Sequence, residues 1–367
     1  MLAFERAIES LLNKLNIPGC SVAIIKQQKV VFAKGFGFAN IENQIPATEN
    51  TPYHIASLTK PFSAAVLMKL VEQKKLDLDN EMSEILRETP IPFQGVTSKG
   101  YAHLCAKIKE IGQDSDIPFA FLFRDYKCDT EKIRVRHHLT HTAQGAPGEK
   151  YNYNGFLFGL LSWVAEEVSG NSFERLLVEN IIAPLNMTKT IPSFKNNNRD
   201  AVIADLATYY LANGDGSFDV SEWPSKDIIK AFEDKGMKIM DRLNASSGII
   251  STVIDLSKFD IAMDQNLIVS EKTKKAMFTQ TTSTKGGILP YGLGWFVQEH
   301  EKEKIVWHYG HAPQAYSSLW LKIPRKNISM ILLANSEGVS GPFDLGAGDI
   351  LKCPFAVMLL SLLKTRL

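Results

Sequence analysis

The sequence predicts an α+β fold in which one antiparallel sheet is built from both ends of the chain and flanked by helices. The segment between the two ends is mostly helical in pattern, which predicts an inserted helical lobe. The strand-forming runs are rich in β-branched and aromatic residues, and they lie at 21–25, 30–38, 293–298, 304–307, 317–322 and 329–334.

Length and composition are those of an ordinary globular chain. The 367 residues are 45% hydrophobic and 22% charged, which is enough to bury a large core. A net charge of +1 gives no electrostatic reason to expect nucleic acid or an anionic membrane as a partner. We expect a single domain over 1–367, with a sheet lobe of about 1–55 and 245–367 and a helical lobe of about 56–244.

The first part of the chain predicts a helix, a hairpin and a second helix. Residues 2–15 carry apolar side chains at helical spacing. The strands at 21–25 and 30–33 are joined by a short polar turn, as in a hairpin. After a turn-rich segment, an apolar helix begins at Ser57, where a serine is favoured as the helix cap.

The middle of the chain is harder to assign. Residues 88–132 mix prolines with short apolar runs, and we expect an atypical insertion of helix and loop. An apolar helical stretch follows at 153–168, whereas 195–243 is polar and mixed. A last helix is expected at about 341–363.

Neither end of the chain predicts membrane attachment. The start forms an amphipathic helix, without the basic segment and apolar run of a signal peptide. The longest apolar run, 355–363, is too short to span a bilayer. The compartment stays open: periplasmic or secreted if a signal peptide has been removed, and cytoplasmic otherwise.

Cysteines and histidines give no metal or cofactor motif, and we expect neither group. The four cysteines are widely spaced without a C-x-x-C pair, so we interpret them as mostly free, buried thiols and leave room for one disulfide. His137, His138 and His141 have an H-x-x-H spacing but no clear third ligand.

Ser57 and Lys60 are the first candidates for chemistry. Three residues apart on a helix, they lie on one face, at the positive end of the helix dipole. A serine needs an adjacent base to become a nucleophile, and a lysine can be that base. Taken alone, a cap serine beside a surface lysine is the simpler explanation of these two residues, so the other segments must decide.

Two further segments supply candidate side chains. Tyr153 precedes an apolar helix and can point into a cleft, although a core tyrosine with a satisfied hydroxyl is the simpler alternative. His308, Gly310 and His311 lie on or beside a late strand, and Gly310 allows close approach of another backbone or a substrate. The alternative for His308 is a satisfied strand histidine.

In this order, the segments resemble the serine β-lactamase and penicillin-binding-protein superfamily, especially its class C-like and esterase-like branch. The S-x-x-K pair is a mark of that superfamily. The resemblance covers most of the chain, and implies a β-lactamase/transpeptidase-like fold. It is carried by Ala56–Lys60, Lys75–Asp79, Ile133–Thr142, Pro147–Gly170, Ser247–Thr252, Tyr291–Trp295 and His308–Gly310.

The resemblance implies a role for each candidate. Ser57 attacks a carbonyl to form an acyl-enzyme, Lys60 keeps Ser57 activated, and Tyr153 shuttles the proton to the leaving group. His308 stands where many relatives have the lysine of K-T-G, and the H-x-G form is typical of peptidase-like and esterase-like members. Gly310 and His311 lie on the substrate side, and the N–H groups of Ser57 and His311 form the oxyanion hole.

The sequence departs from the superfamily pattern at two places near the site. The Y-x-N motif has Gly155 in place of its asparagine. Asn154, one residue earlier, is kept as a substrate-side candidate although its side chain is expected to point elsewhere. The segment after Thr142 is short and 88–132 is longer than usual, so the rim of the site is rebuilt.

We therefore predict a serine hydrolase that forms an acyl-enzyme on a small ester, amide or D-amino-acid peptide. An esterase or D-Ala carboxypeptidase is favoured over an antibiotic-destroying β-lactamase. Two alternatives remain: a non-catalytic muropeptide-binding or sensing protein on the same fold, for which Gly155 argues, and an acyltransferase. The natural substrate and the oligomeric state are not determined by the sequence.

Overall fold

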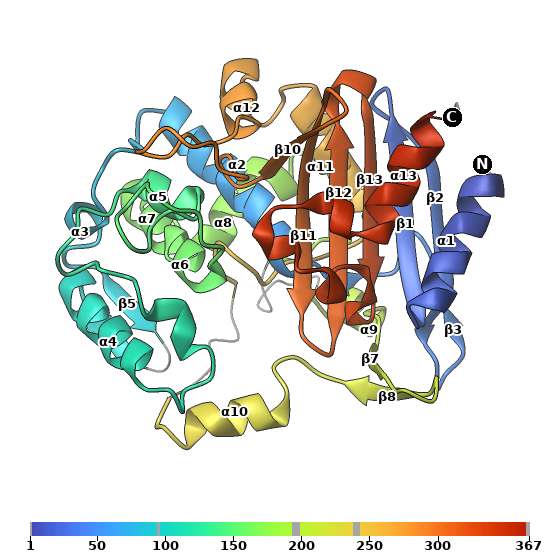
Figure 1. Ribbon diagram of the computed structural model, residues 1–367, viewed down its shortest axis with the longest axis horizontal. Coiled ribbons are helices and arrows are strands. Elements are labelled where there is room, and N and C mark those ends of the chain that lie inside the picture. The colour runs from blue at the N-terminus through green and yellow to red at the C-terminus, as the bar shows by residue number, and fades with distance from the viewer. Residues whose placement is uncertain (1, 94–95, 193–198, 238–242, 365–367) are drawn as a thin grey trace.

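A seven-stranded antiparallel sheet lies at the centre of the computed structural model, which describes residues 2–93, 96–192, 199–237 and 243–364. The strand order is β10-β11-β12-β13-β1-β2-β3 (Figure 1), so strands from both ends of the chain meet where β1 pairs with β13. The predicted α+β fold is therefore confirmed. The strands span Gly19–Lys26 (β1), Lys29–Asn40 (β2), Ile45–Pro46 (β3), Phe296–His300 (β10), Glu303–Ala312 (β11), Tyr316–Ile323 (β12) and Ile328–Ala334 (β13).

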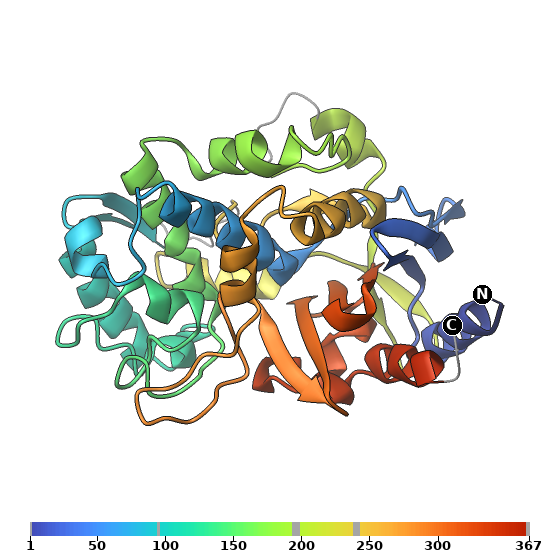
Figure 2. The same cartoon turned by 90° about the horizontal axis from the view of Figure 1, so that it is seen from above.

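Helices cover both faces of this sheet and divide the core in two. Every residue of β13 is buried, and its side chains alternate between the faces. Met330 and Leu332 pack in the core that contains α1 (Leu2–Lys14) and α13 (Pro354–Lys364). Ile331 and Leu333 pack on the other side, under α11 (Val253–Asp264) and α2 (Thr59–Glu72), and Figure 2 shows the helices on opposite sides of the sheet.

The last helix begins later in the sequence than predicted. The helix α13 begins only at Pro354, whereas 337–352 form four short 3₁₀ turns, η5 to η8. Glycine and proline are frequent in that stretch and disfavour a continuous α-helix. The helix packs against α1, so the two ends of the described chain lie side by side (Figure 1). Among the described helices, none is long and apolar enough to cross a membrane.

The helix α2 is the link between the sheet and the other helices. It is buried almost all round, as expected for a helix in the middle of a large protein. Its neighbours on the far side from the sheet include α7 and α8. The helices of this part are α3 (Met82–Ile85), α5 (Val135–Leu139), α6 (Gly155–Gly159), α7 (Leu161–Ser169) and α8 (Phe173–Leu177), and the π-helical turn η3 (Val178–Ile182) follows them.

The insertion at 88–132 has more order than its sequence predicted. A hairpin of β5 (Pro90–Phe93) and β6 (Val96–Lys99) precedes α4 (Tyr101–Gln113) and the 3₁₀ turn η2 (Ala120–Phe123). The first strand was not predicted because it contains two prolines, and proline is tolerated in a strand only where no ladder hydrogen bond is needed. A disulfide joins Cys105 to Cys128, so the expectation of mostly free thiols is correct only for Cys20 and Cys353.

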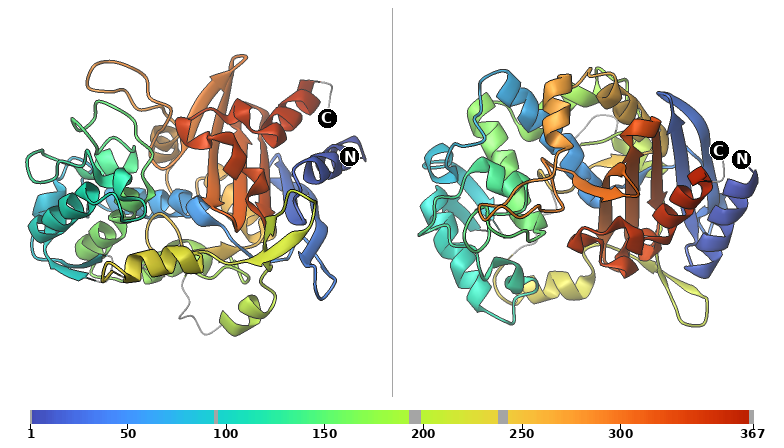
Figure 3. Two further views of the ribbon diagram at one scale, coloured as in Figure 1. Left: turned by 60° about the horizontal axis from the view of Figure 1, so that its bottom comes forward. Right: turned by 45° about the horizontal axis from the view of Figure 1, so that its top comes forward.

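The polar stretch 195–243 also contains regular elements in its described part. These are α9 (Arg199–Ala204), the hairpin of β7 (Tyr209–Ala212) and β8 (Phe218–Ser221), and α10 (Lys226–Glu233). Figure 3 shows α10 and this hairpin crossing from the helical part towards the sheet. The remaining elements are β4 (Tyr53–His54), paired with β9 (Ile250–Ser251), and α12 (Glu271–Met277).

A buried ion pair fixes α11 on the sheet. Lys322 Nζ on β12 lies 2.6 Å from Asp260 Oδ1 on α11, which also accepts a hydrogen bond from Trp320. Burial disfavours the charged amine, but Asp260 and Asp264 outweigh this effect and hold the pKa of Lys322 above its usual value. The contact is therefore a buried ion pair. Removing either partner would leave the other buried without its main counter-ion, which is strongly destabilising.

Replacing one partner of this pair should destabilise the fold. We expect Asp260→Asn to lower the free energy of unfolding by about 3 kcal/mol, because it leaves the Lys322 ammonium buried with only Asp264 near it. The matched control is Glu179→Gln, which breaks an exposed ion pair with Arg175 and should cost less than about 1 kcal/mol. Urea unfolding of both variants measures the difference, and equal losses would contradict this account.

Candidate active site

Ser57 lies in a 3₁₀ turn, η1 (Ala56–Leu58), between β4 and α2. Ala56 has a φ of 47°, a left-handed conformation that is uncommon for residues other than glycine. The residue that caps α2 is Leu58, without a side-chain cap hydrogen bond, so the expected capping role of Ser57 is wrong. Its hydroxyl instead accepts a 2.7 Å hydrogen bond from Lys60 Nζ.

Lys60 is fully buried, and its surroundings are uncharged. Its Nζ atom donates to the Ser246 carbonyl oxygen at 3.4 Å and lies over the rings of Tyr153 and Phe158, 4.9 and 5.5 Å from their centroids. Burial lowers the pKa of Lys60 well below its usual value. The neutral amine, which is the only form that can accept the proton of Ser57, is therefore populated at lower pH than in an ordinary lysine.

Tyr153 faces the same pair of residues. Its hydroxyl is buried and makes no hydrogen bond of normal geometry, yet it lies close enough for Ser57 to influence it. Burial, and then Tyr309, raise the pKa of Tyr153 well above its usual value, and Ser57 offsets this only in part. Tyr153 is therefore a protonated phenol that can donate a proton.

Position 155 opens directly towards Lys60. A Cβ atom added to Gly155 would lie 3.7 Å from both Lys60 Nζ and Ser246 Oγ, at ordinary contact distance. A side chain here would touch the base, as the superfamily motif implies for its asparagine. Because residue 155 is a glycine, this space is part of the pocket beside Ser57.

Asn154 does not take over this role, because its amide is used within the fold. Its side chain caps α6 by accepting from the Leu157 N–H. It also donates to the Leu122 carbonyl oxygen and to Gln144 Oε1. The residue is buried and is absent from the pocket lining in the described part of the chain. The structure therefore does not bring the substrate-side candidate Asn154 to the site.

His308 is placed behind Tyr153 rather than in the pocket. Its Nδ1 lies 2.7 Å from the Tyr309 carbonyl oxygen, so this nitrogen carries the proton, and Nε2 accepts from the Tyr291 hydroxyl at 2.8 Å. Burial, and then Lys60, lower the pKa of His308 well below its usual value. His308 is thus a neutral imidazole with both nitrogens engaged, and this geometry does not support the catalytic role that was predicted for it.

Gly310 brings the strand β11 against the serine turn. A Cβ atom at this position would approach the Ile55 carbonyl oxygen and Ser318 Oγ to 2.3 Å, so only glycine fits. The strand β10 pairs with β11 only up to Trp307, which leaves the stretch from His308 to Ala312 without that neighbour. His311 lines the pocket together with Ser57, as their predicted oxyanion role requires.

The pocket beside Ser57 has a volume of about 390 Å³ and takes residues from many segments. His311 and Ala312 belong to β11 and Tyr316 to β12, whereas Gly155 and Phe156 belong to α6. Sequence reasoning missed Ser246, Tyr291 and the aromatic lining. The serine repeat in Ala245-Ser-Ser-Gly248 and the tryptophan at 223 in a polar stretch were the available signals.

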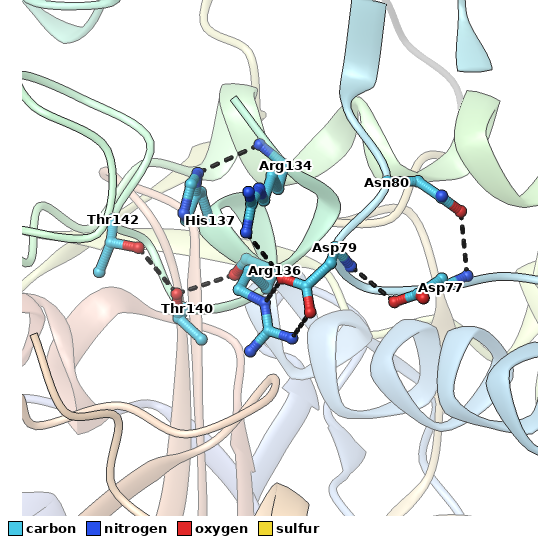
Figure 4. Close-up of polar contacts among 8 residues, drawn as sticks. All are labelled: Asp77, Asp79, Asn80, Arg134, Arg136, His137, Thr140 and Thr142. Carbon is cyan, nitrogen blue, oxygen red and sulfur yellow. Dashed lines mark hydrogen bonds and ion pairs between the residues drawn. The ribbon is translucent and has the colours of Figure 1, made fainter. Parts of the chain in front are cut away.

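The histidines near residue 140 are engaged in the fold. His137 Nδ1 accepts from the Arg134 N–H, beside the ion pairs of Arg134 and Arg136 with Asp79 that Figure 4 shows. His138 bridges Tyr126 and the Leu157 carbonyl oxygen. The described residues contain no group of His, Cys, Asp and Glu that could hold a metal ion.

The sheet order, the S-x-x-K pair and the facing tyrosine define a fold of the β-lactamase/transpeptidase type. The family model described as Beta-lactamase matches residues 4–351, and the chain belongs to this family. The predicted resemblance is therefore confirmed. Solved structures that resemble this chain include a penicillin-binding protein from Bacillus halodurans and a D-amino acid amidase, and at 18% and 20% identity they show the shared fold alone.

Three comparisons illustrate this relationship. The chain is 27% identical over 341 residues to Protein flp of Staphylococcus aureus, covering 90% of this chain and 62% of the relative. It therefore spans about three fifths of that protein. An octameric penicillin-binding protein homologue from Pyrococcus abyssi has a TM-score of 0.67 at 26% identity, covering 98% of this chain and 77% of that one. The D-amino acid amidase of Ochrobactrum anthropi has a TM-score of 0.64 at 20% identity over the full length of both chains, which shows the fold alone.

The reactivity of Ser57 should follow the protonation of Lys60. Below its pKa, Lys60 is charged and cannot accept a proton, so the rate should fall as pH falls through that value. Because burial lowers the pKa, the rate should already be level before a normal lysine titrates. The groups facing Lys60 include His141 and His308, whose pKa values burial also lowers, so both are less readily protonated than an ordinary histidine.

The measurement is the rate of fluorophosphonate labelling of Ser57 between about pH 5 and 11. Tyr153→Phe is the matched control, since it keeps the ring over Lys60 and removes only the hydroxyl; its midpoint should not move by more than about half a unit. A rate that still rises above about pH 10 would mean that Lys60 titrates as an ordinary lysine and that this account is wrong.

Proposed function

We propose that the protein is a serine hydrolase that forms an acyl-enzyme through Ser57. The observation that carries this proposal is the 2.7 Å hydrogen bond between Lys60 Nζ and Ser57 Oγ, with an amine whose pKa burial lowers. A serine with an adjacent neutral base is an activated nucleophile. Esters are the preferred substrates, because an ester loses an alkoxide more readily than an amide loses an amine.

Acylation proceeds through a proton relay. As Ser57 Oγ attacks the substrate carbonyl, its proton moves to Lys60 Nζ. The ammonium that forms is stabilised by the Ser246 carbonyl oxygen and by the faces of the Tyr153 and Phe158 rings, each cation–π contact being worth about 1 kcal/mol or more when desolvated. Tyr153 then gives its proton to the departing oxygen and is reprotonated from Lys60.

Deacylation uses the same groups in reverse. Water attacks the acyl-enzyme, its proton passes to Tyr153 and Lys60, and Ser57 leaves with the proton returned to it. During both steps, the N–H groups of Ser57 and His311 donate hydrogen bonds that stabilise the negative charge on the carbonyl oxygen. One such donor is worth about 3 kcal/mol in related chemistry. Tyr291 and His308 position the Tyr153 ring and stay outside the reaction.

The first test is the identity of the nucleophile. Purified protein is treated with a fluorophosphonate, and the adduct is mapped by mass spectrometry, with hydrolysis of a p-nitrophenyl ester measured in parallel. We expect an adduct on Ser57 and a loss of at least about 1,000-fold in kcat/KM for Ser57→Ala. Ser63→Ala is the matched control, because that hydroxyl bonds the Thr59 carbonyl oxygen within α2. Activity that survives Ser57→Ala would refute the proposal.

Two other functions give different results in the same assays. A muropeptide-binding protein would bind its ligand but release no product from esters or nitrocefin. An acyltransferase would deliver the acyl group to an added alcohol or amine in preference to water, which product analysis detects. Hydrolysis that needs Ser57 and is not diverted by these acceptors supports the hydrolase.

Restoring the missing amide should change the substrate preference. The space at Gly155 admits a side chain in contact with Lys60, so Gly155→Asn adds a polar group to the site and takes volume from the pocket. We expect nitrocefin turnover to rise by about tenfold, which is the value of one hydrogen bond, and p-nitrophenyl ester turnover to fall. Gly155→Ala is the control for volume alone, and should lower ester turnover without the gain on nitrocefin.

A further inference from the structure

One side of the pocket beside Ser57 is an apolar wall built from three separate segments. The insertion supplies two residues from or next to η2, the α6–α7 region supplies three, and the segment before α10 supplies one. We define the apolar wall by these residues: Phe119, Leu122, Phe156, Leu160, Trp163 and Trp223.

The wall is held together by contacts between its own rings. Phe119 lies 6.1 Å from Phe156 and 6.3 Å from Trp223, measured between ring centroids. Behind them, the buried Phe123 contacts Phe156 at 5.4 Å in an edge-on arrangement. Such aromatic pairs stabilise each other beyond simple burial. The wall is therefore a packed surface, although its first and last residues, Phe119 and Trp223, are more than 100 residues apart in the sequence.

The described lining of the pocket is uncharged as well as largely apolar. Within the described part of the chain, its lining includes no Asp, Glu, Lys or Arg side chain. Of its two histidines, His54 has a pKa lowered to about 4 by burial, and His311 turns its Nε2 towards Glu337, 3.2 Å away. A substrate carboxylate or ammonium group placed here would lose its hydration without gaining an oppositely charged partner from the described lining, which is costly.

We propose that this pocket selects the acyl group of the substrate, and that the group is an uncharged, apolar chain or ring of about six carbons or more. The inference rests on the proposed function. The acyl group fits this place better than the leaving group, because it stays attached to Ser57 after the alcohol has gone and must be held for the second step. The residues of the apolar wall are supplied by the insertion, the α6–α7 region and the segment before α10.

The first experiment varies only the acyl group. We measure kcat/KM for p-nitrophenyl acetate, butyrate and hexanoate. Each buried methylene is worth about 0.8 kcal/mol, or about fourfold in rate, so hexanoate should exceed acetate by on the order of 100-fold. Hexyl acetate is compared with ethyl acetate as the reverse series. A preference set only by the length of the alcohol would overturn the assignment of the acyl group to the wall.

Variants on one segment then locate the effect. Phe119→Ala removes a wall residue, and should lower the hexanoate-to-acetate ratio by about tenfold. Phe121→Ala, two residues away, removes a ring that is 60% exposed and outside the pocket, so it should leave the ratio unchanged. Equal ratios in both variants and the parent would show that the wall does not select the substrate.

The second experiment adds a negative charge to the substrate and, in a variant, a positive charge to the pocket. A p-nitrophenyl ester of the same chain length that ends in a carboxylate should react at least about tenfold more slowly than hexanoate. Ile228→Lys, on the pocket face of α10, should remove or reverse that difference. Ile229→Lys is the matched control, because Ile229 is exposed and is not part of the lining. Parent protein that prefers the carboxylated ester would overturn the inference.

Failure of this inference can be distinguished from failure of the proposed function. Fluorophosphonate labelling of Ser57 reports on the nucleophile without using the wall, and it also shows that each variant is folded. Labelling and Ser57-dependent hydrolysis of acetate with no gain on hexanoate would refute the acyl preference alone. Absence of labelling and of any Ser57-dependent turnover would refute both.

Discussion

The burial of one lysine amine governs the arrangement of the site. Lys60 has a serine hydroxyl, a carbonyl oxygen and two aromatic faces around its nitrogen, and no carboxylate is paired with it in the described structure. Such surroundings tolerate the neutral amine and give the ammonium only partial compensation. Burial also favours the uncharged form of the neighbouring groups, since it raises the pKa of Tyr153 and lowers the pKa of His308. The site thus brings these groups together with little permanent charge, as the proposed proton transfer requires.

The sequence predicted those parts of the fold that have a local signal. Alternating apolar residues marked the strands at both ends, and the Ser57–Lys60 spacing placed hydroxyl and amine on one helix face. By contrast, the apolar wall depends on contacts between segments such as Phe119 and Trp223, whose positions follow from packing that no local pattern encodes. The hairpin at Pro90–Lys99 was missed because its prolines argue against a strand.

Asn154 and His308 show a second limit of sequence reasoning. Both stand at motif positions that suggest contact with substrate, yet each has its polar atoms engaged by the protein. A motif gives the residue type and its approximate place, but hydrogen-bond partners decide which way the side chain faces. Tyr291 illustrates the converse, since its hydrogen bond to His308 and the contacts of both rings with the ring of Tyr153 are visible only in the structure.

The position of the two chain ends has a practical consequence. The helices α1 and α13 pack together on the outer face of the sheet, and Figures 1 and 2 place both ends at the far side of the molecule from the helical part. The pocket opens between that helical part and the strands β11 and β12. A fluorescent protein, an affinity handle or a solid support attached at either end of this chain would therefore lie away from Ser57 and the pocket.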